Sequence, residues 1–480
     1  MLDACLDRIA RYDPSLNALT TFNTERARVE ASASTQRWAA GRPCGPLDGV
    51  PIGVKDMQDV AGLPTTNGNP LMRGNVAEQD ALIVARLRRA GAIVVAKTNV
   101  PEFGAGGNSV NPVWGATGNP YDPTRIAGGS SGGSAAALAA SFLPLCTGSD
   151  TGGSLRLPAA LCGVVGYRPS GDVVAHPGRP LGWSVISVLG PMARNMDDLL
   201  LMLRAIQGAD AGDPLTVPTD PARFDDITPA DIGGLRVGYS VDFGDLPVDP
   251  DVRVAFQARV KAIAPHVATC EPVDMNLGQM DRCFDILRAE SFVAAFDATG
   301  EGSVDQFGAH VAANVALGRG LSFRDRAWAH LEQTRILRRF RERTDDFDII
   351  LLPTVPVPAF PWRQSYPARI EGQEMDIYYR WLALTYRGSL MGGPAITLPS
   401  GAGADGLPFG VQLLGRLQGD RALLSAALSL EALFASMPAT RPLTPDLKLT
   451  LSAQVDLKSP VTHPPHETGT GQTIQVGSAV

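Results

Sequence analysis

Apolar and polar positions alternate along the chain in blocks that predict an α/β protein. Residues 50–55 and 93–97 are short apolar runs of the length and β-branched content typical of buried strands. Between them, residues 80–90 place apolar side chains at helical spacing, and Gly91 ends that helix before the second run. Strands that alternate with helices favour a mixed sheet covered by helices.

The same pattern predicts the other elements. In chain order they are a helical region at 1–48 with an apolar break at 19–22, a loop at 104–134, a helix at 134–142, a strand at 143–147, a helix at 191–208, a strand at 235–239, helices within 251–345, a strand at 349–352, a Pro-rich loop to about 372, strands at 395–398 and 409–414, and a helix at 421–435. We expect a single large α/β domain over residues 1–450. Residues 451–480 are polar and unpatterned, and we expect a mobile or loosely docked tail.

Composition narrows the class of protein. The net charge of -7 gives no basic footprint for nucleic acid, and no apolar run is long enough for a transmembrane helix. The N-terminus lacks the basic and apolar regions of a secretory signal. The six cysteines include no Cys-x-x-Cys pair, which favours reduced thiols over disulfides or zinc. We therefore expect a cytoplasmic protein that binds neither membrane nor nucleic acid.

Glycine and serine gather in two stretches, Gly128–Ser134 and Gly148–Arg156. Glycine lets the backbone adopt positive φ and approach a ligand closely. Consecutive free N–H groups in such turns can bind an anion, which is what an oxyanion hole beside a serine requires. The two stretches are therefore candidates for a serine hydrolase site.

Simpler interpretations compete with this one. A flexible linker is disfavoured because apolar segments flank both stretches, and a Walker A phosphate loop lacks its lysine. Ser130 and Ser131 both fit Gly-x-Ser-x-Gly, but a polar loop precedes them where a nucleophile elbow needs a strand. We expect the six histidines to be surface or structural residues rather than catalytic bases, and no two of them have the spacing of metal ligands.

A serine nucleophile without histidine still needs a base. Lysine can serve when burial removes its proton. Lys55 ends the apolar run 50–55 and is the candidate base. Two interpretations are open: a lysine buried with the strand, or an ordinary surface lysine exposed to solvent.

On these residues the chain resembles the amidase signature family. Gly128–Ser134 and Gly148–Pro158 are similar to the two halves of its signature, and Gly49–Asp56 to its lysine segment. Gly393–Pro399 and Gly406–Gln412 also resemble family segments. The resemblance covers roughly residues 4–436 and implies one large α/β domain with a central mixed sheet.

The resemblance also implies roles for individual residues. Ser154 would be the nucleophile, Ser130 the relay serine after a cis peptide bond, and Lys55 the base. Backbone N–H groups of Thr151, Gly152, Gly153 and Ser154 would hold the oxyanion. Ser131 and Asp150 would support the site by hydrogen bonds. No cofactor or metal is expected.

Two functions remain in view. The first is a stand-alone amidohydrolase acting on small amides or anilides, with carbamates (a urethanase activity) or esters as further substrates. The second is the glutaminase subunit of a tRNA-dependent amidotransferase, which would hold the amino and carboxylate groups of glutamine with an acid and an arginine. An alignment anchored on Gly393 and Pro394 places Leu382 at that acid's position, although Asp376 is near. The first function therefore ranks higher. It requires no obligate second subunit, and it is compatible with a homodimer.

The substrate pocket is expected along the aromatic stretch from Phe360 to Trp381. Tyr378, Trp381 and Leu382 are the residues expected to line it. Such a lining suits an aryl or alkyl acyl group. Ordinary core packing is the competing interpretation of the same residues.

Overall fold

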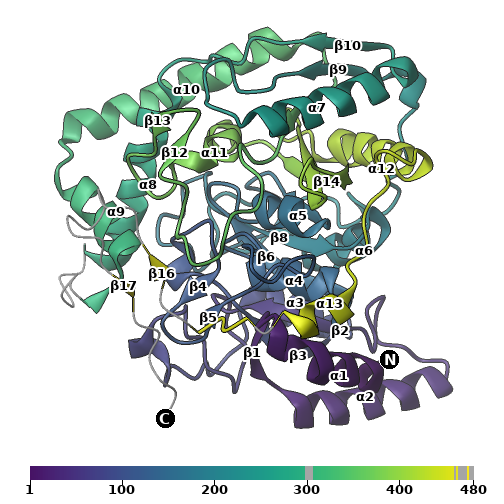
Figure 1. Cartoon of the computed structure of the whole chain (residues 1–480). Coiled ribbons are helices and arrows are strands. Elements are labelled where there is room, and N and C mark those ends of the chain that lie inside the picture. Colours follow the sequence, from purple (N-terminus) through teal and green to yellow (C-terminus); the bar gives the residue numbers. More distant parts are fainter. Residues whose placement is uncertain (298–305, 454, 459–460, 463–472, 475–480) are drawn as a thin grey trace.

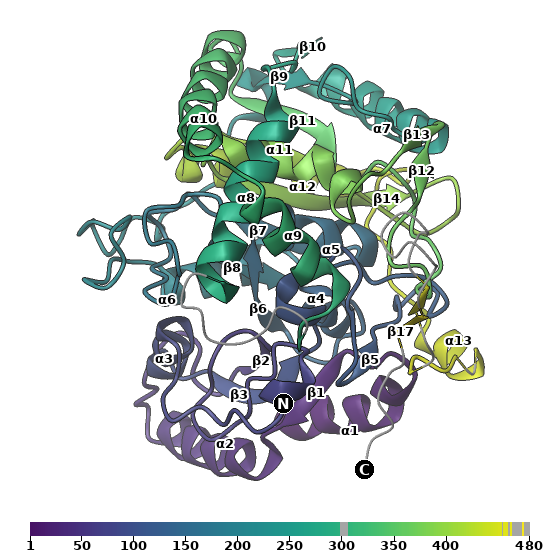
Figure 2. The same ribbon diagram turned by 90° about the vertical axis from the view of Figure 1, so that its left-hand side faces the viewer.

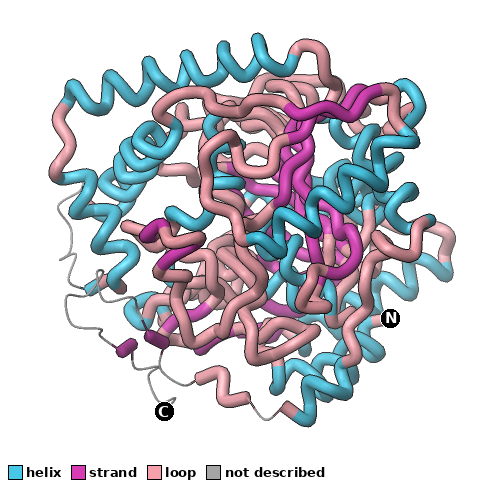
Figure 3. The backbone as a smooth tube through the Cα atoms, turned by 45° about the horizontal axis from the view of Figure 1, so that its top comes forward, coloured by secondary structure: helices cyan, strands magenta, loops and turns pink. Residues whose placement is uncertain are grey.

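A computed structural model of the chain describes residues 1–297, 306–453, 455–458, 461–462 and 473–474. A mixed sheet of eleven strands runs through its centre (Figures 1 and 3). In spatial order the strands are β1 (Leu19–Phe22), β3 (Ile93–Thr98), β2 (Pro51–Lys55), β6 (Leu145–Asp150), β8 (Val188–Ala193), β7 (Val165–Arg168), β14 (Ala395–Ala402), β15 (Pro408–Leu414), β11 (Ile349–Pro353), β9 (Arg236–Tyr239) and β10 (Thr269–Pro272). The predicted single large domain with a central mixed sheet is confirmed.

Helices surround this sheet. They are α1 (Leu2–Tyr12), α2 (Thr24–Ala39), α3 (Leu82–Arg89), α4 (Gly132–Ala139), α5 (Arg156–Cys162), α6 (Met196–Ile206), α7 (Pro250–Ile263), α8 (Met280–Phe296), α9 (Ala309–Arg319), α10 (Phe323–Thr344), α11 (Ala383–Leu390), α12 (Asp420–Ser436) and α13 (Leu447–Ser452). Figure 2 shows α4 and α5 on one side of the sheet and α3 and α6 on the other. Every residue of α4 and α5 is buried, which agrees with the apolar, Ala-rich sequence of α4; α5 was not predicted.

Parallel strands place the functional segments at one edge of the sheet. β2 pairs in parallel with both β3 and β6, so their carboxyl ends lie side by side. All residues of β2 and β3 are buried, which explains their unbroken apolar sequences. Lys55 ends β2, and β6 leads into the second glycine-rich stretch.

The structure corrects several sequence-based boundaries. Residues 191–193 belong to β8, and only 196–206 are helical, with Asn195 capping the helix through its side chain. β6 begins at Leu145 and extends to Asp150, three residues beyond the expected end of this strand. β7, β8 and β10 were not predicted. Two-stranded pairs β4–β5 (Val110–Asn111, Gly115–Ala116) and β12–β13 (Arg369–Ile370, Gln373–Glu374) lie within the expected loops.

The boundary at residue 450 stays a prediction. α13 spans it, and beyond it Leu457 is buried and its carbonyl accepts a hydrogen bond of 2.7 Å from the N–H of Ala116. The short pair β16–β17 (Val461–Thr462, Thr473–Ile474) follows. The expectation of a mobile tail otherwise falls on residues 454, 459–460, 463–472 and 475–480, outside the described residues.

Candidate active site

Lys55 is a buried lysine surrounded by hydroxyl groups. Its side chain is fully buried, and its Nζ lies 2.6 Å from Ser130 Oγ, 2.9 Å from Ser131 Oγ and 2.9 Å from Ser149 Oγ. Burial lowers the pKa of Lys55 to about 7, and the charge of Asp150 opposes the shift only in part. A neutral amine is therefore accessible near neutral pH, which is what a general base requires.

Strand alternation separates Lys55 from its neighbour Asp56. Successive side chains of a strand point to opposite faces. The Asp56 carboxylate accepts hydrogen bonds from Thr66 and lies 3.2 Å from Nζ of Lys97, which is also fully buried. Lys55 therefore faces the serines while Asp56 is held by another cation.

Asp150 fixes the second glycine-rich stretch from inside the protein. It is fully buried and accepts hydrogen bonds from the N–H groups of Gly153 and Leu155 and from the guanidinium groups of Arg156 and Arg168. Burial alone would raise its pKa, but the two arginines hold the pKa well below the usual range. The permanent carboxylate thereby orders the turn that presents Ser154.

Three of the four backbone N–H groups expected to bind an oxyanion are available in this turn. In the described chain, the N–H groups of Thr151, Gly152 and Ser154 make no hydrogen bond, and all three residues line a cavity. The N–H of Gly153 instead donates to Asp150 Oδ1 at 2.9 Å. In this structure the Gly153 N–H is therefore engaged by Asp150, and its expected role as an oxyanion donor stays a prediction.

Gly153 has a different structural role. Its φ is 119°, and a Cβ at this position would overlap the Thr385 side chain. Thr385 Oγ1 donates a 2.7 Å hydrogen bond to the carbonyl of Gly152. Only glycine lets the turn approach α11 this closely.

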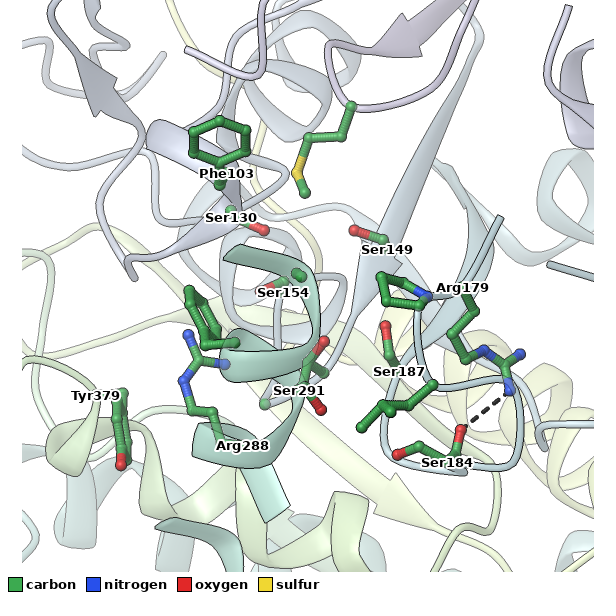
Figure 4. Close-up of a pocket in the computed structure, with 18 of the residues that line it drawn as sticks. Phe103, Ser130, Ser149, Ser154, Arg179, Ser184, Ser187, Arg288, Ser291 and Tyr379 are labelled. Carbon is green, nitrogen blue, oxygen red and sulfur yellow. Dashed lines mark hydrogen bonds between the residues drawn. The ribbon is translucent and has the colours of Figure 1, made fainter. Parts of the chain in front are cut away.

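Ser130, Ser149 and Ser154 face one cavity of about 330 Å³ (Figure 4). Ser131 lies behind them: its N–H donates to the Ser154 carbonyl at 3.2 Å, and its hydroxyl accepts from Lys55. The peptide bond between Gly129 and Ser130 is cis, as the resemblance implied. The structure thus brings together two glycine-rich stretches and the lysine strand that are distant in sequence.

The cavity walls agree only partly with the predicted pocket. Tyr378 and Leu382 line the cavity, but Trp381 does not. The Trp381 ring packs against Gly107 and meets Phe360 edge to face at 5.3 Å, so it supports the loop behind the site. Trp381 is therefore removed from the predicted pocket.

Sequence reasoning missed several parts of the site, among them Ser149, the segment 176–189 and one helix face. Ser149 stands two residues after Thr147, whose Oγ1 accepts the Lys55 N–H at 2.9 Å, so period-two alternation could have placed both on the Lys55 side. The wall formed by α8 was also missed. Its lining residues are Phe284, Arg288, Ser291, Phe292, Ala295 and Phe296. Their spacing marks one helix face, but no motif in the chain indicates that this face borders the serines.

Comparison with known proteins settles the family. The model of the family described as Amidase matches residues 1–424. This chain is a member of the amidase signature family. It is 34% identical to an acylamidase of Rhodococcus erythropolis over 90% of this chain and 91% of that protein. As a member of this family it is an enzyme that hydrolyses amides.

Two further similarities mark the breadth of this family. The chain is 33% identical to a glutamyl-tRNA(Gln) amidotransferase subunit of Chloroflexus aurantiacus, over 87% of this chain and 89% of that one. The crystal structure of a bacterial aryl acylamidase of the amidase signature family superposes with a TM-score of 0.83 at 27% identity, covering 92% of this chain and 95% of that one.

Two more observations concern membranes and metals. No described helix is both long and apolar enough to cross a membrane. Within the same residues, no three His, Cys, Asp or Glu side chains gather as a metal site would need.

Proposed function

We propose that this amidase cleaves small linear amides and anilides through an acyl-enzyme on Ser154, with Ser130 as proton relay and Lys55 as base. The observation that carries the proposal is the 2.6 Å contact between Lys55 Nζ and Ser130 Oγ. Burial lowers the pKa of this lysine to about 7.

The chemistry can be followed proton by proton. Neutral Lys55 takes the proton of Ser130, Ser130 takes that of Ser154, and Ser154 Oγ attacks the carbonyl carbon. The N–H groups of Thr151, Gly152 and Ser154 would receive the negative charge that develops on the carbonyl oxygen. The relay then runs in reverse and protonates the leaving nitrogen as the C–N bond breaks. A water molecule, deprotonated along the same path, attacks the ester and releases Ser154.

The cavity favours a stand-alone amidohydrolase over a glutaminase subunit. Glutamine carries an ammonium group that needs an acidic partner. Among the described residues that line the cavity there is no aspartate or glutamate. Phe103, Phe284, Phe292 and Phe296 instead offer apolar surface suited to an aryl or alkyl group. Carbamates and esters share the reacting carbonyl and belong to the same proposal as further substrates.

A hydrolysis screen with the purified chain alone tests this proposal. The panel is 4-nitroanilides, primary amides, carbamates, esters and glutamine. We expect turnover of anilides without a second protein, lost in Ser154→Ala, and a fluorophosphonate adduct on Ser154 by mass spectrometry. An adduct on Ser131, or glutamine turnover that appears only with a partner protein, would contradict it.

A further inference from the structure

Arg288 presents a cation to the cavity and has no acidic partner among the described residues. It lies on α8 and lines the cavity, while only 7% of the residue is exposed (Figure 4). Its Nη2 donates a 2.6 Å hydrogen bond to Tyr378 Oη. Within the described chain no carboxylate lies within ion-pair distance, and its Nε is buried without a hydrogen-bond partner. One of five donors is therefore used, by a neutral acceptor.

Aromatic rings hold this guanidinium in place. Its Cζ lies 4.9 Å from the ring centre of Phe292, 5.6 Å from Tyr378 and 5.0 Å from Tyr379. Such contacts favour a cation and fix the orientation of its plane, but they accept no N–H hydrogen bond in that plane. A buried charge is normally paired, because removing it from water costs several kcal/mol.

The second cavity arginine provides the contrast. Arg179 lies 3.3 Å from the buried carboxylate of Asp213 and donates to the carbonyls of Gly182 and Ser184. The carboxylate of Asp213 therefore balances its charge, and its hydrogen bonds to the two carbonyls stabilise its own loop. In Figure 4, Arg179 and Arg288 lie on opposite sides of the cavity, with Ser154 between them in the view. The surplus positive charge is therefore on the α8 side.

Asp285, one turn before Arg288 on α8, does not supply the missing charge. Its carboxylate accepts from Arg380 at 2.9 Å and from Tyr379 Oη at 2.8 Å. Asp281 is likewise bound to Arg387 and Tyr386. Glu290, the third acid of α8, pairs with Arg326, so each carboxylate of this helix is paired with another group.

We propose that Arg288 recognises a carboxylate on the substrate, so that the substrates include linear amides with a negatively charged group. Planar guanidinium and carboxylate groups match in a bidentate geometry that a neutral group cannot supply. The inference rests on the proposed function for the position of the scissile bond. The carboxylate can belong to the acyl part, as in half-amides of dicarboxylic acids, or to the amine part, as in N-acyl aminobenzoates.

Two matched substrate pairs distinguish these sources. The first pair is the mono-4-nitroanilide of glutaric acid and the 4-nitroanilide of pentanoic acid; the second is 4-acetamidobenzoate and 4-methylacetanilide. We expect kcat/KM to favour the charged member in one pair. Arg288→Met should lower kcat/KM for the favoured charged substrate by about 30-fold or more and change kcat/KM for its neutral counterpart by no more than about threefold. For the charged substrate, Arg288→Lys should give a kcat/KM between those of the wild type and Arg288→Met. Unchanged fluorophosphonate labelling of Ser154 verifies that the variant site is intact.

A binding measurement separates this inference from the proposed function. In calorimetry, the Ser154→Ala protein should bind a charged compound about tenfold or more tightly than the Ser154→Ala/Arg288→Met protein binds it. This result does not depend on whether the wild type hydrolyses the compound. Binding that is equal in the two proteins would overturn the role of Arg288. So would a loss in Arg288→Met that is the same for charged and neutral substrates, because that is the result expected of a packing residue.

Discussion

Lys97 Nζ lies 3.2 Å from Asp56 Oδ1, and both side chains are fully buried. Burial raises the pKa of Asp56 and lowers the pKa of Lys97, so each charge depends on the other. This pairing also occupies the carboxylate next to Lys55 in the chain. An unoccupied aspartate there would raise the pKa of the proposed base.

Asp56→Asn should therefore destabilise the protein. The substitution keeps an oxygen for Thr66 but leaves Lys97 buried without its counter-ion, at a cost of about 3 kcal/mol in the free energy of unfolding. Urea unfolding measures this. The double variant Asp56→Asn/Lys97→Met should recover part of the loss; a double variant less stable than the single one would show that the pair is not the cause.

Gly153→Ala should abolish most activity while the protein stays folded. The new Cβ would collide with Thr385 and force the turn to move, and with it Ser154 and the N–H groups of Thr151 and Gly152. We expect a loss of at least about 100-fold in kcat, the size that follows removal of oxyanion contacts.

Gly406→Ala is the matched control. Gly406 also has a positive φ, 78°, but no atom lies within 4 Å of its added Cβ. It should cost about 1 kcal/mol of stability from backbone strain and leave kcat unchanged. Similar activity losses in both variants would refute the role assigned to Thr385.

Ser149→Ala should move the pH profile to lower pH. The Ser149 hydroxyl is one of three that accept hydrogen bonds from Lys55, and they stabilise the ammonium form. Removing one acceptor lowers the pKa of Lys55 below its value of about 7, so the rate should reach its plateau at a lower pH. A midpoint that moves upward in a full kcat/KM profile would contradict this.

Local sequence was enough to predict part of the site. The glycine- and serine-rich stretches and the lysine at the end of an apolar run marked the region, and the resemblance to the family gave Lys55, Ser130 and Ser154 their expected roles, which stay predictions. The hydrogen bond from the Gly153 N–H to Asp150 could not be predicted, because the buried position of Asp150 depends on Arg156 and Arg168.

Other features depend on contacts between distant segments. Trp381 and Leu382 are adjacent and both apolar, yet only Leu382 reaches the cavity, since the tryptophan packs on Gly107. Arg288 is one of many arginines in the chain. Only the packing of α8 against the serine turns reveals that it lacks an acidic partner among the described residues.

The most direct test of the proposed mechanism is the pH dependence of acylation of Ser154, followed by stopped-flow with a 4-nitroanilide and with the matching 4-nitrophenyl ester. The base must be unprotonated, so the wild-type rate should fall about tenfold per pH unit below a midpoint near 7 and level off above it. Lys55→Met should remove this ionisation and lower the rate by several orders of magnitude, more for the anilide because its leaving nitrogen must be protonated. A Lys55→Met enzyme that keeps the wild-type midpoint would show that another group is the base.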